Sequence, residues 1–222
     1  MQLTNDPEFL LMRQFLETVY SRLLQAYGPQ NWWPADEPFE VMVGAVLTQN
    51  TSWFNVEKAI NNLKQAHELD AAKILALADD ELASLIRPSG YFNVKTRRLK
   101  NLCQWIMEAG GLKALAHWNT SDLRVALLSL NGIGPETADD ILLYAFERPV
   151  FVIDIYTRRL FSRLGLICGD EDYETLRHLF ESALPDDVPL YNEYHALIVR
   201  HAKERCSQDE DCLHCQIESA PK

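Results

Sequence analysis

The sequence predicts an all-α fold. Apolar residues recur at helical spacing in nearly every segment, and only short polar or glycine-containing breaks separate these segments. Strands with alternating apolar and polar residues are not evident. The chain has 222 residues, of which 47% are hydrophobic, so it can bury a substantial core. This length fits one domain of ordinary size or two small domains that share a cleft.

The predicted helices follow one another along the whole chain. The first helix ends at Gly28, and a later one ends at the Gly110-Gly111 pair. Another helix begins with Pro135, whose missing N–H costs nothing at the first helical position. Residues 149–153 form either a short extended piece or a buried connector. The helices are predicted over residues 7–28, 38–50, 53–66, 70–77, 79–86, 94–110, 120–130, 135–146, 155–165, 173–184 and 190–206.

The charge balance leaves the type of partner open. The formal net charge is −11, which by itself argues against nucleic acid, because phosphate binding depends on Lys and Arg. Residues 87–100, however, carry five basic residues and no acid, and Arg158, Arg159 and Arg163 form a second basic group. These groups are either solvated helix faces or a basic surface on an acidic protein.

Targeting signals are not apparent in the sequence. No apolar run reaches the roughly 18 residues that a membrane span needs, and the first residues have no basic region before an apolar stretch. We therefore expect a cytoplasmic protein with no membrane association. We also expect the protein to be a monomer.

A glycine turn joins two of the predicted helices. The stretch LNGIGPET at residues 130–137 lacks the Gly-Lys-Ser/Thr ending of a Walker loop and the third glycine of a dinucleotide fingerprint. Its glycines allow a sharp turn, and the N–H groups of the turn and the following helix can point together at a phosphate oxygen. The alternative is a compact helix–helix corner without a ligand.

One acid stands alone in the apolar stretch that follows. Asp154, within VFVIDIY, directly precedes the predicted helix 155–165. An aspartate at that place is a preferred N-cap, worth about 1 kcal/mol.

Taken together, these stretches resemble the helix-hairpin-helix DNA glycosylase superfamily, and the endonuclease III group in particular. The resemblance lies in LNGIGPETADDILLYAF followed by VFVIDIYTRRLFSRLG, in VGAVLTQNT, and in PSGYFNVKTRRL, which is similar to a wedge loop. It runs from about residue 28 to the end. It implies base excision repair of double-stranded DNA by two helical domains, one of residues 29–147 and one of residues 1–28 plus 148–222, with a cleft between them.

The resemblance also assigns roles in DNA binding. The hairpin would hold a backbone phosphate through main-chain N–H groups without reading the base sequence. Two side chains, Gln49 and Tyr91, match positions that fill the gap left by a flipped nucleotide. The residues expected at the DNA backbone are Asn131, Gly132, Ile133, Gly134 and Thr137.

Asp154 and Glu136 define the expected chemistry. Asp154 matches the catalytic aspartate, which stabilises the positive charge of an oxocarbenium-like transition state and can orient the attacking water. Glu136 occupies the position at which bifunctional members carry a lysine nucleophile, and a carboxylate cannot form an imine. The sequence therefore predicts a monofunctional glycosylase, although another lysine, such as Lys95 or Lys203, could replace the missing one. A non-catalytic module that binds damaged DNA is the third reading.

The expected substrate follows from a closer resemblance. Residues 31–60 resemble a branch that includes a 3-methyladenine DNA glycosylase, in which the corresponding aromatic residues line the base pocket. Indole rings suit a cationic alkylated purine through stacking and cation–π attraction. Hypoxanthine or another deaminated base is the alternative. The pocket residues would be Trp32, Trp33, Pro34 and Trp53.

Three of the five cysteines are closely spaced near the C-terminus. Cys206, Cys212 and Cys215 read C-x5-C-x2-C, whereas endonuclease III relatives use C-x6-C-x2-C-x5-C to hold a [4Fe–4S] cluster. Pro221 would stand at the fourth position. The site could hold an incomplete-set cluster, a Cys3His zinc ion completed by His214 or His201, or nothing. The other two, Cys103 and Cys168, are expected to be buried thiols.

Overall fold

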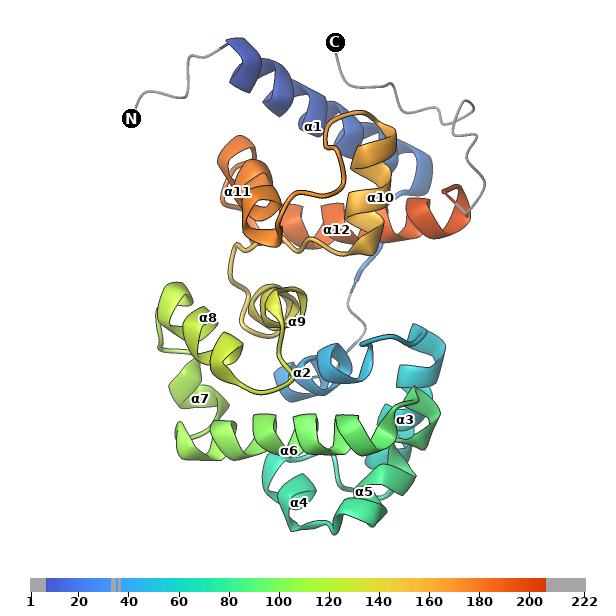
Figure 1. The fold of residues 1–222 in the computed structure, drawn as a ribbon, viewed down its shortest axis with the longest axis vertical. Helices are drawn as coiled ribbons and strands as arrows, with labels where there is room; N and C mark the ends of the chain where they lie inside the picture. Colours follow the sequence, from blue (N-terminus) through green and yellow to red (C-terminus); the bar gives the residue numbers. More distant parts are fainter. Residues whose placement is uncertain (1–6, 33–34, 36, 207–222) are drawn as a thin grey trace. The chain divides into compact units, whose positions relative to one another are not determined.

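The computed structural model describes residues 7–32, 35 and 37–206, and every regular element in these ranges is a helix (Figure 1). The chain divides into two compact units. Unit 1 contains Met1–Trp32 and Pro149–Lys222, and unit 2 contains Trp33–Arg148. The all-α prediction is thus confirmed. None of the described helices is long and apolar enough to cross a membrane.

Unit 2 is built around α2 (Pro38–Leu47), whose residues 39–47 are all buried. It packs against α3 (Trp53–Gln65), α6 (Phe92–Glu108), α9 (Pro135–Asp140) and η2 (Ile141–Ala145). Apart from Glu40, which pairs with Lys64 at 2.7 Å, the helix is apolar on all sides, and such a helix belongs in the centre of a domain. The remaining elements are α4 (Ala71–Ala76), α5 (Asp79–Leu85), η1 (Arg87–Ser89), α7 (Leu112–Leu115) and α8 (Thr120–Ser129).

Unit 1 combines the first helix with the last three. α12 (Val188–Glu204) packs against α1 (Pro7–Tyr27) and α10 (Ile155–Arg163), while α11 (Tyr173–Ala183) contacts α1 (Figure 1). Aromatic rings fill its core: the Phe151 and Phe180 rings stack with centroids 4.5 Å apart. The Tyr194 hydroxyl donates to the Leu16 carbonyl at 2.9 Å, which ties α12 to α1.

Several elements differ from the expected ones. The predicted helix 135–146 changes from α to π geometry at Ile141, and the short η1 and α7 had no clear signal. Pro149–Ile153 forms no strand: residues 150–153 are a buried connector.

Of the two cysteines predicted to be buried, one is buried and one is exposed. Cys103 on α6 is buried, and burial raises its pKa to about 12. The prediction for Cys168 was wrong, because this thiol is exposed. Cys168 lies in the turn between α10 and α11, next to Gly169, and not in a helix.

Candidate functional site

The glycine hairpin joins α8 to α9 within unit 2. Gly132 has φ +98°, and a Cβ atom there would overlap the Arg98 side chain, so two independent reasons require glycine. Gly134 is the N-cap of α9, with Pro135 at the first helical position. Ile133 is buried and anchors the turn, while Asn131 and Gly134 are exposed. The turn therefore offers its main chain to the solvent from a fixed position.

Two of the acids that follow the hairpin have different roles. Asp139 is fully buried and accepts two bonds from Arg124 on α8, at 2.7 Å from Nε and 3.0 Å from Nη2. This bidentate pair holds α9 against α8 and neutralises the charge near the hairpin. Glu136 is exposed in the first turn of α9, where the helix dipole favours an acid.

The side chain of Gln49 is bonded to the hairpin. Its Nε2 donates to the Gly132 carbonyl at 3.0 Å and to the Thr137 hydroxyl at 2.9 Å, and its Oε1 accepts from Arg98 Nη1. Thr137 itself is buried. In this structure Gln49 thus fixes the hairpin relative to α2 and α6, and insertion into DNA would require it to exchange these bonds.

The predicted wedge, Tyr91, stands at the start of α6. It has φ +45°, unusual for a residue other than glycine, and its side chain is 70% exposed. Behind it, Lys95 is only 1% exposed and donates from Nζ to the carbonyls of Leu47, at 2.8 Å, and Ser89, at 2.7 Å. Burial, with a smaller contribution from Arg98, lowers the pKa of Lys95 to about 8. Lys95 therefore fastens the wedge loop to the end of α2.

Asp154 is the N-cap of α10 in unit 1 and is 8% exposed. Its Oδ1 accepts from the Thr157 N–H at 2.7 Å, and its Oδ2 lies 3.4 Å from His195 Nε2 on α12. Burial alone would raise the pKa of Asp154. The adjacent His195, together with the bonds from Thr157, holds that pKa below its usual value. The carboxylate is thus both the cap and a fixed buried negative charge.

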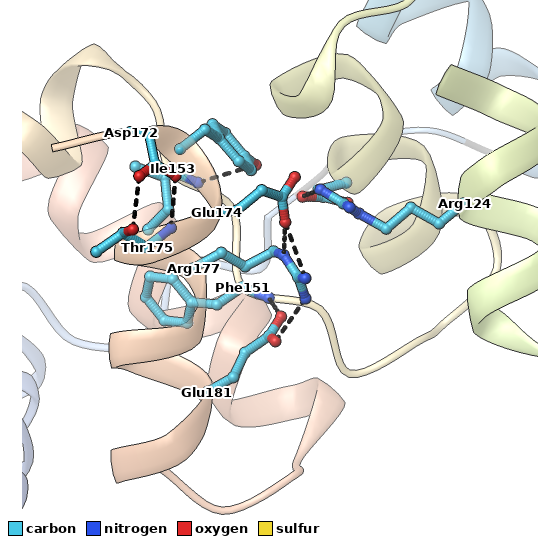
Figure 2. A network of polar contacts seen from close by, with 10 residues as sticks. Arg124, Phe151, Ile153, Asp172, Glu174, Thr175, Arg177 and Glu181 are labelled. Carbon is cyan, nitrogen blue, oxygen red and sulfur yellow. Dashed lines mark hydrogen bonds and ion pairs between the residues drawn. The ribbon is translucent and has the colours of Figure 1, made fainter. Parts of the chain in front are cut away.

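Side chains of α11 hold the segment that leads to Asp154 (Figure 2). The Phe151 N–H donates to Glu181 Oε1 at 3.0 Å, and the Ile153 N–H donates to the Tyr173 hydroxyl at 3.3 Å. Arg177 orients Glu181, with 2.6 Å between its Nη1 and Glu181 Oε2. Because side chains satisfy these buried N–H groups, the segment needs no neighbouring strand.

An aromatic and cationic group lies near Asp154 in the same unit. Lys203 Nζ on α12 is 5.2 Å from the centre of the Tyr156 ring and 6.0 Å from that of Trp32. Burial lowers the pKa of Lys203, while the charge of Asp154 opposes this shift. Burial and then Asp154 raise the pKa of the Tyr156 hydroxyl. These shifts place both side chains within the electrostatic reach of the carboxylate.

The residues expected in a base pocket belong to both units. Trp32 is half-buried in unit 1, and Trp53 begins α3 in unit 2. Trp33 and Pro34 lie outside the described residues. The pocket assignment stays a prediction.

Of the three clustered cysteines, only Cys206 lies within the described residues. It is buried just after α12, and its carbonyl accepts from Arg159 Nη1 at 3.2 Å. Cys212 and Cys215 lie outside the described ranges, as does His214, and the metal site stays a prediction.

Comparisons with known proteins identify the family of the chain. The sequence model described as "HhH-GPD superfamily base excision DNA repair protein" matches residues 43–186. The chain belongs to this superfamily. A Methanocaldococcus jannaschii protein provisionally named a DNA repair glycosylase is 50% identical over 207 residues, which cover 92% of this chain and 94% of that protein. The chain is therefore an endonuclease III-like DNA glycosylase of base excision repair.

Solved structures of the superfamily share the fold. The 3-methyladenine DNA glycosylase of H. pylori, bound to 1,N6-ethenoadenine, is 34% identical and has a TM-score of 0.75, with coverage of 87% of this chain and 98% of that one. An endonuclease III–DNA complex has a TM-score of 0.78 at 20% identity and covers 92% of each chain, which is evidence for the fold alone.

Sequence reasoning missed the partners of Asp154. His195 and Tyr156 were not identified, and Lys203 was considered only as a substitute lysine. His195 and Lys203 are eight residues apart on α12, so the sequence could indicate that they lie two turns apart on one helix. The packing of α12 against α10, which brings them to Asp154, had no local signal.

Proposed function

We propose that this protein is a monofunctional DNA glycosylase that hydrolyses the N-glycosidic bond of a flipped, damaged purine, with Asp154 as the catalytic carboxylate. The observation that carries the proposal is the environment of Asp154. A buried carboxylate with a lowered pKa, fixed by Thr157 and His195, is a permanent negative charge on a rigid support.

The proposed reaction uses that charge directly. As the bond between C1′ and the base nitrogen breaks, the base leaves with the electron pair and the sugar acquires oxocarbenium character. Asp154 stabilises this charge, and water then attacks C1′ and passes a proton to the carboxylate. The products are the free base and an abasic site. Extrusion of the nucleotide costs a few kcal/mol, and least for a damaged base.

Glu136 supports hydrolysis over imine chemistry. It is exposed in the first turn of α9. By the family resemblance, this is the position at which bifunctional glycosylases carry a lysine. A carboxylate has no amine to attack C1′, so water remains as the nucleophile.

The resemblance of residues 31–60 and one relative support an alkylated purine as the substrate. The indole rings of Trp32 and Trp53 suit stacking on a cationic base. The 34% identical H. pylori protein is named a 3-methyladenine glycosylase and was solved with 1,N6-ethenoadenine. A cationic alkylated purine is also a ready leaving group, so a single carboxylate can suffice.

A panel of damaged duplexes tests the proposal. The purified chain is incubated with duplexes that contain 3-methyladenine, 7-methylguanine, 1,N6-ethenoadenine, hypoxanthine or uracil, and the released bases are separated by chromatography. We expect release of alkylated purines, with the sugar-phosphate backbone intact until alkali is added. Release of deaminated bases alone would replace the substrate assignment.

The position of Lys203 favours a second candidate, a glycosylase with abasic-site lyase activity. Lys95 is not suited to this role, because it is buried and bonded to two carbonyls. Lys203 has a lowered pKa and lies near Asp154, so it is the better candidate amine. Borohydride would trap a DNA adduct of the wild type, and Lys203→Gln would abolish it, only if this second candidate is correct.

The cysteine cluster would serve a structural role in the proposed enzyme. Cys206, Cys212 and Cys215 supply three thiolates, one fewer than a [4Fe–4S] cluster takes from a full set. We propose that these three cysteines hold an iron–sulfur cluster whose fourth ligand is not a cysteine. An absorbance band near about 400 nm, together with iron in anaerobically purified protein, would support this; colourless, iron-free protein would contradict it.

A further inference from the structure

A basic cavity lies beside the glycine hairpin in unit 2. Its volume is about 430 Å³, and it is lined by Val94, Arg97, Arg98, Lys100, Asn101 and Asn131. The first five come from α6, where residues 94, 97, 98 and 101 follow the spacing of one helix face. Among the residues that the structure describes, no carboxylate lines it. On a chain with a net charge of −11, such a concentration of cations needs an explanation.

Two contacts connect residues that line the cavity to the hairpin. Asn101 Nδ2 donates to the Asn131 carbonyl at 3.2 Å. The stem of Arg98 packs against Gly132 so closely that no Cβ fits there, and its guanidinium donates to Gln49. These contacts fix the position of the cavity relative to the hairpin, so a group bound at the hairpin lies next to the cavity.

The three cations are not equally engaged. Lys100 pairs with Asp79 and also donates to the Leu77 carbonyl at 2.7 Å, so part of its charge is already compensated. Arg97 is exposed, and within the described residues it makes no hydrogen bond and no ion pair. A guanidinium with five donors in a planar fork is the side chain best suited to a phosphate.

We propose that this cavity is a second phosphate site for the DNA backbone, in which Arg97 binds the phosphate and Asn101 and Asn131 line its walls. The proposal rests on the proposed DNA glycosylase function and adds a contact outside the hairpin. A DNA strand carries a phosphate about every 3.4 Å along the helix axis. A strand held at the hairpin thus presents a neighbouring phosphate to the cavity.

The salt dependence of DNA binding tests the proposal. Dissociation constants of the full chain for an undamaged duplex and for one with a tetrahydrofuran abasic-site analogue are measured over a series of KCl concentrations. Each phosphate contact contributes about 0.9 to the slope of log K against log [salt]. We expect Arg97→Gln to reduce the slope by about 0.9 for both duplexes, because a phosphate contact does not depend on the damage.

Lys113→Gln is the matched control. Lys113 is exposed on α7, which follows the far end of α6 from Tyr91, and it likewise makes no hydrogen bond or ion pair in the described part of the chain. The Lys113→Gln substitution removes the same net charge without changing the cavity, and the salt slope of this variant should equal that of the wild type. Equal slopes for Arg97→Gln and Lys113→Gln would overturn the proposal.

The outcome can be separated from that of the proposed function. Lys113→Gln should release the damaged base at the wild-type rate at every enzyme concentration, whereas Arg97→Gln should need more enzyme to reach its maximal single-turnover rate, because Arg97 is assigned to DNA binding. Asp154→Asn should lose base release and keep the wild-type salt slope. If no damaged base is released by any variant, the slopes on undamaged DNA still decide whether the cavity binds phosphate.

Discussion

In unit 1 the proposed catalytic group is a side chain buried next to other side chains, whereas unit 2 presents the main chain of the hairpin and the side chain of Tyr91 to the solvent. Asp154 is fixed by Thr157 and His195 within the interior of unit 1. The hairpin and the wedge loop of unit 2 are instead held from behind, by Gln49 and Lys95. The first arrangement tunes a charge, and the second positions donors for a ligand that supplies its own charge.

This difference predicts which property each unit controls. Changes around Asp154 should alter the rate of base release and leave DNA affinity unchanged. Changes behind the hairpin and the wedge should alter stability and DNA affinity, and leave the rate at saturation unchanged. Each of the following variants tests this division.

Asp154→Asn should have the largest effect. The neutral amide can still accept from the Thr157 N–H, so the cap is kept, but the stabilising charge is lost. We expect the single-turnover rate of base release to fall about a thousandfold, while the affinity for duplex DNA changes less than about threefold. Wild-type excision by this variant would remove Asp154 from the mechanism.

Lys95→Met should destabilise unit 2. It leaves the carbonyls of Leu47 and Ser89 without their donor, at about 1–3 kcal/mol each in the free energy of unfolding. Lys113→Met, at an exposed position, should be close to neutral. Urea unfolding measures both, and a wild-type midpoint for Lys95→Met would show that Lys95 does not fasten the wedge loop.

The same variant has a pH signature. The pKa of Lys95 is about 8 in the folded chain, below its ordinary value near 10.5. Between these values the unfolded chain binds more protons, so wild-type stability should rise with pH across this window. The stability gap between wild type and Lys95→Met should therefore widen from pH 8 to about pH 10.5. A constant gap would mean that the pKa is not lowered.

Gly132→Ala should perturb the hairpin. The positive φ and the overlap with Arg98 together should cost about 1–3 kcal/mol of stability. Displacement of Arg98 should also release Gln49 and weaken DNA binding about tenfold. The control is Gly134→Ala, which has an ordinary φ and no atom near its Cβ, and should fold with wild-type stability. Equal thermal unfolding of the two variants would contradict this account.

His195→Gln should have the smallest effect, and it should depend on pH. His195 lowers the pKa of Asp154, so its removal should raise that pKa and shift the acidic limb of the kcat/KM profile to higher pH. Near neutral pH we expect a loss of about tenfold, with DNA affinity unchanged. An unshifted acidic limb would mean that His195 does not tune Asp154.

Much of the fold could be predicted from the sequence because it depends on local patterns. Helical periodicity located the long helices, Gly28 and Pro135 marked an end and a start, and the glycines of residues 130–134 marked the hairpin. The short η1 and α7 were missed, since three or four residues carry too little periodicity to register.

Local sequence patterns were enough to predict an all-α chain, the hairpin, and Asp154 at the start of a helix. Which side chains contact the hairpin and Asp154 became known only from the packing of the helices. Packing of α12 against α10 brings His195 to Asp154. Packing of α6 against α2 buries Lys95, which then donates to the Leu47 carbonyl and is not a surface charge. Such long-range contacts depend on how whole helix faces fit together, and no short stretch of sequence encodes that fit.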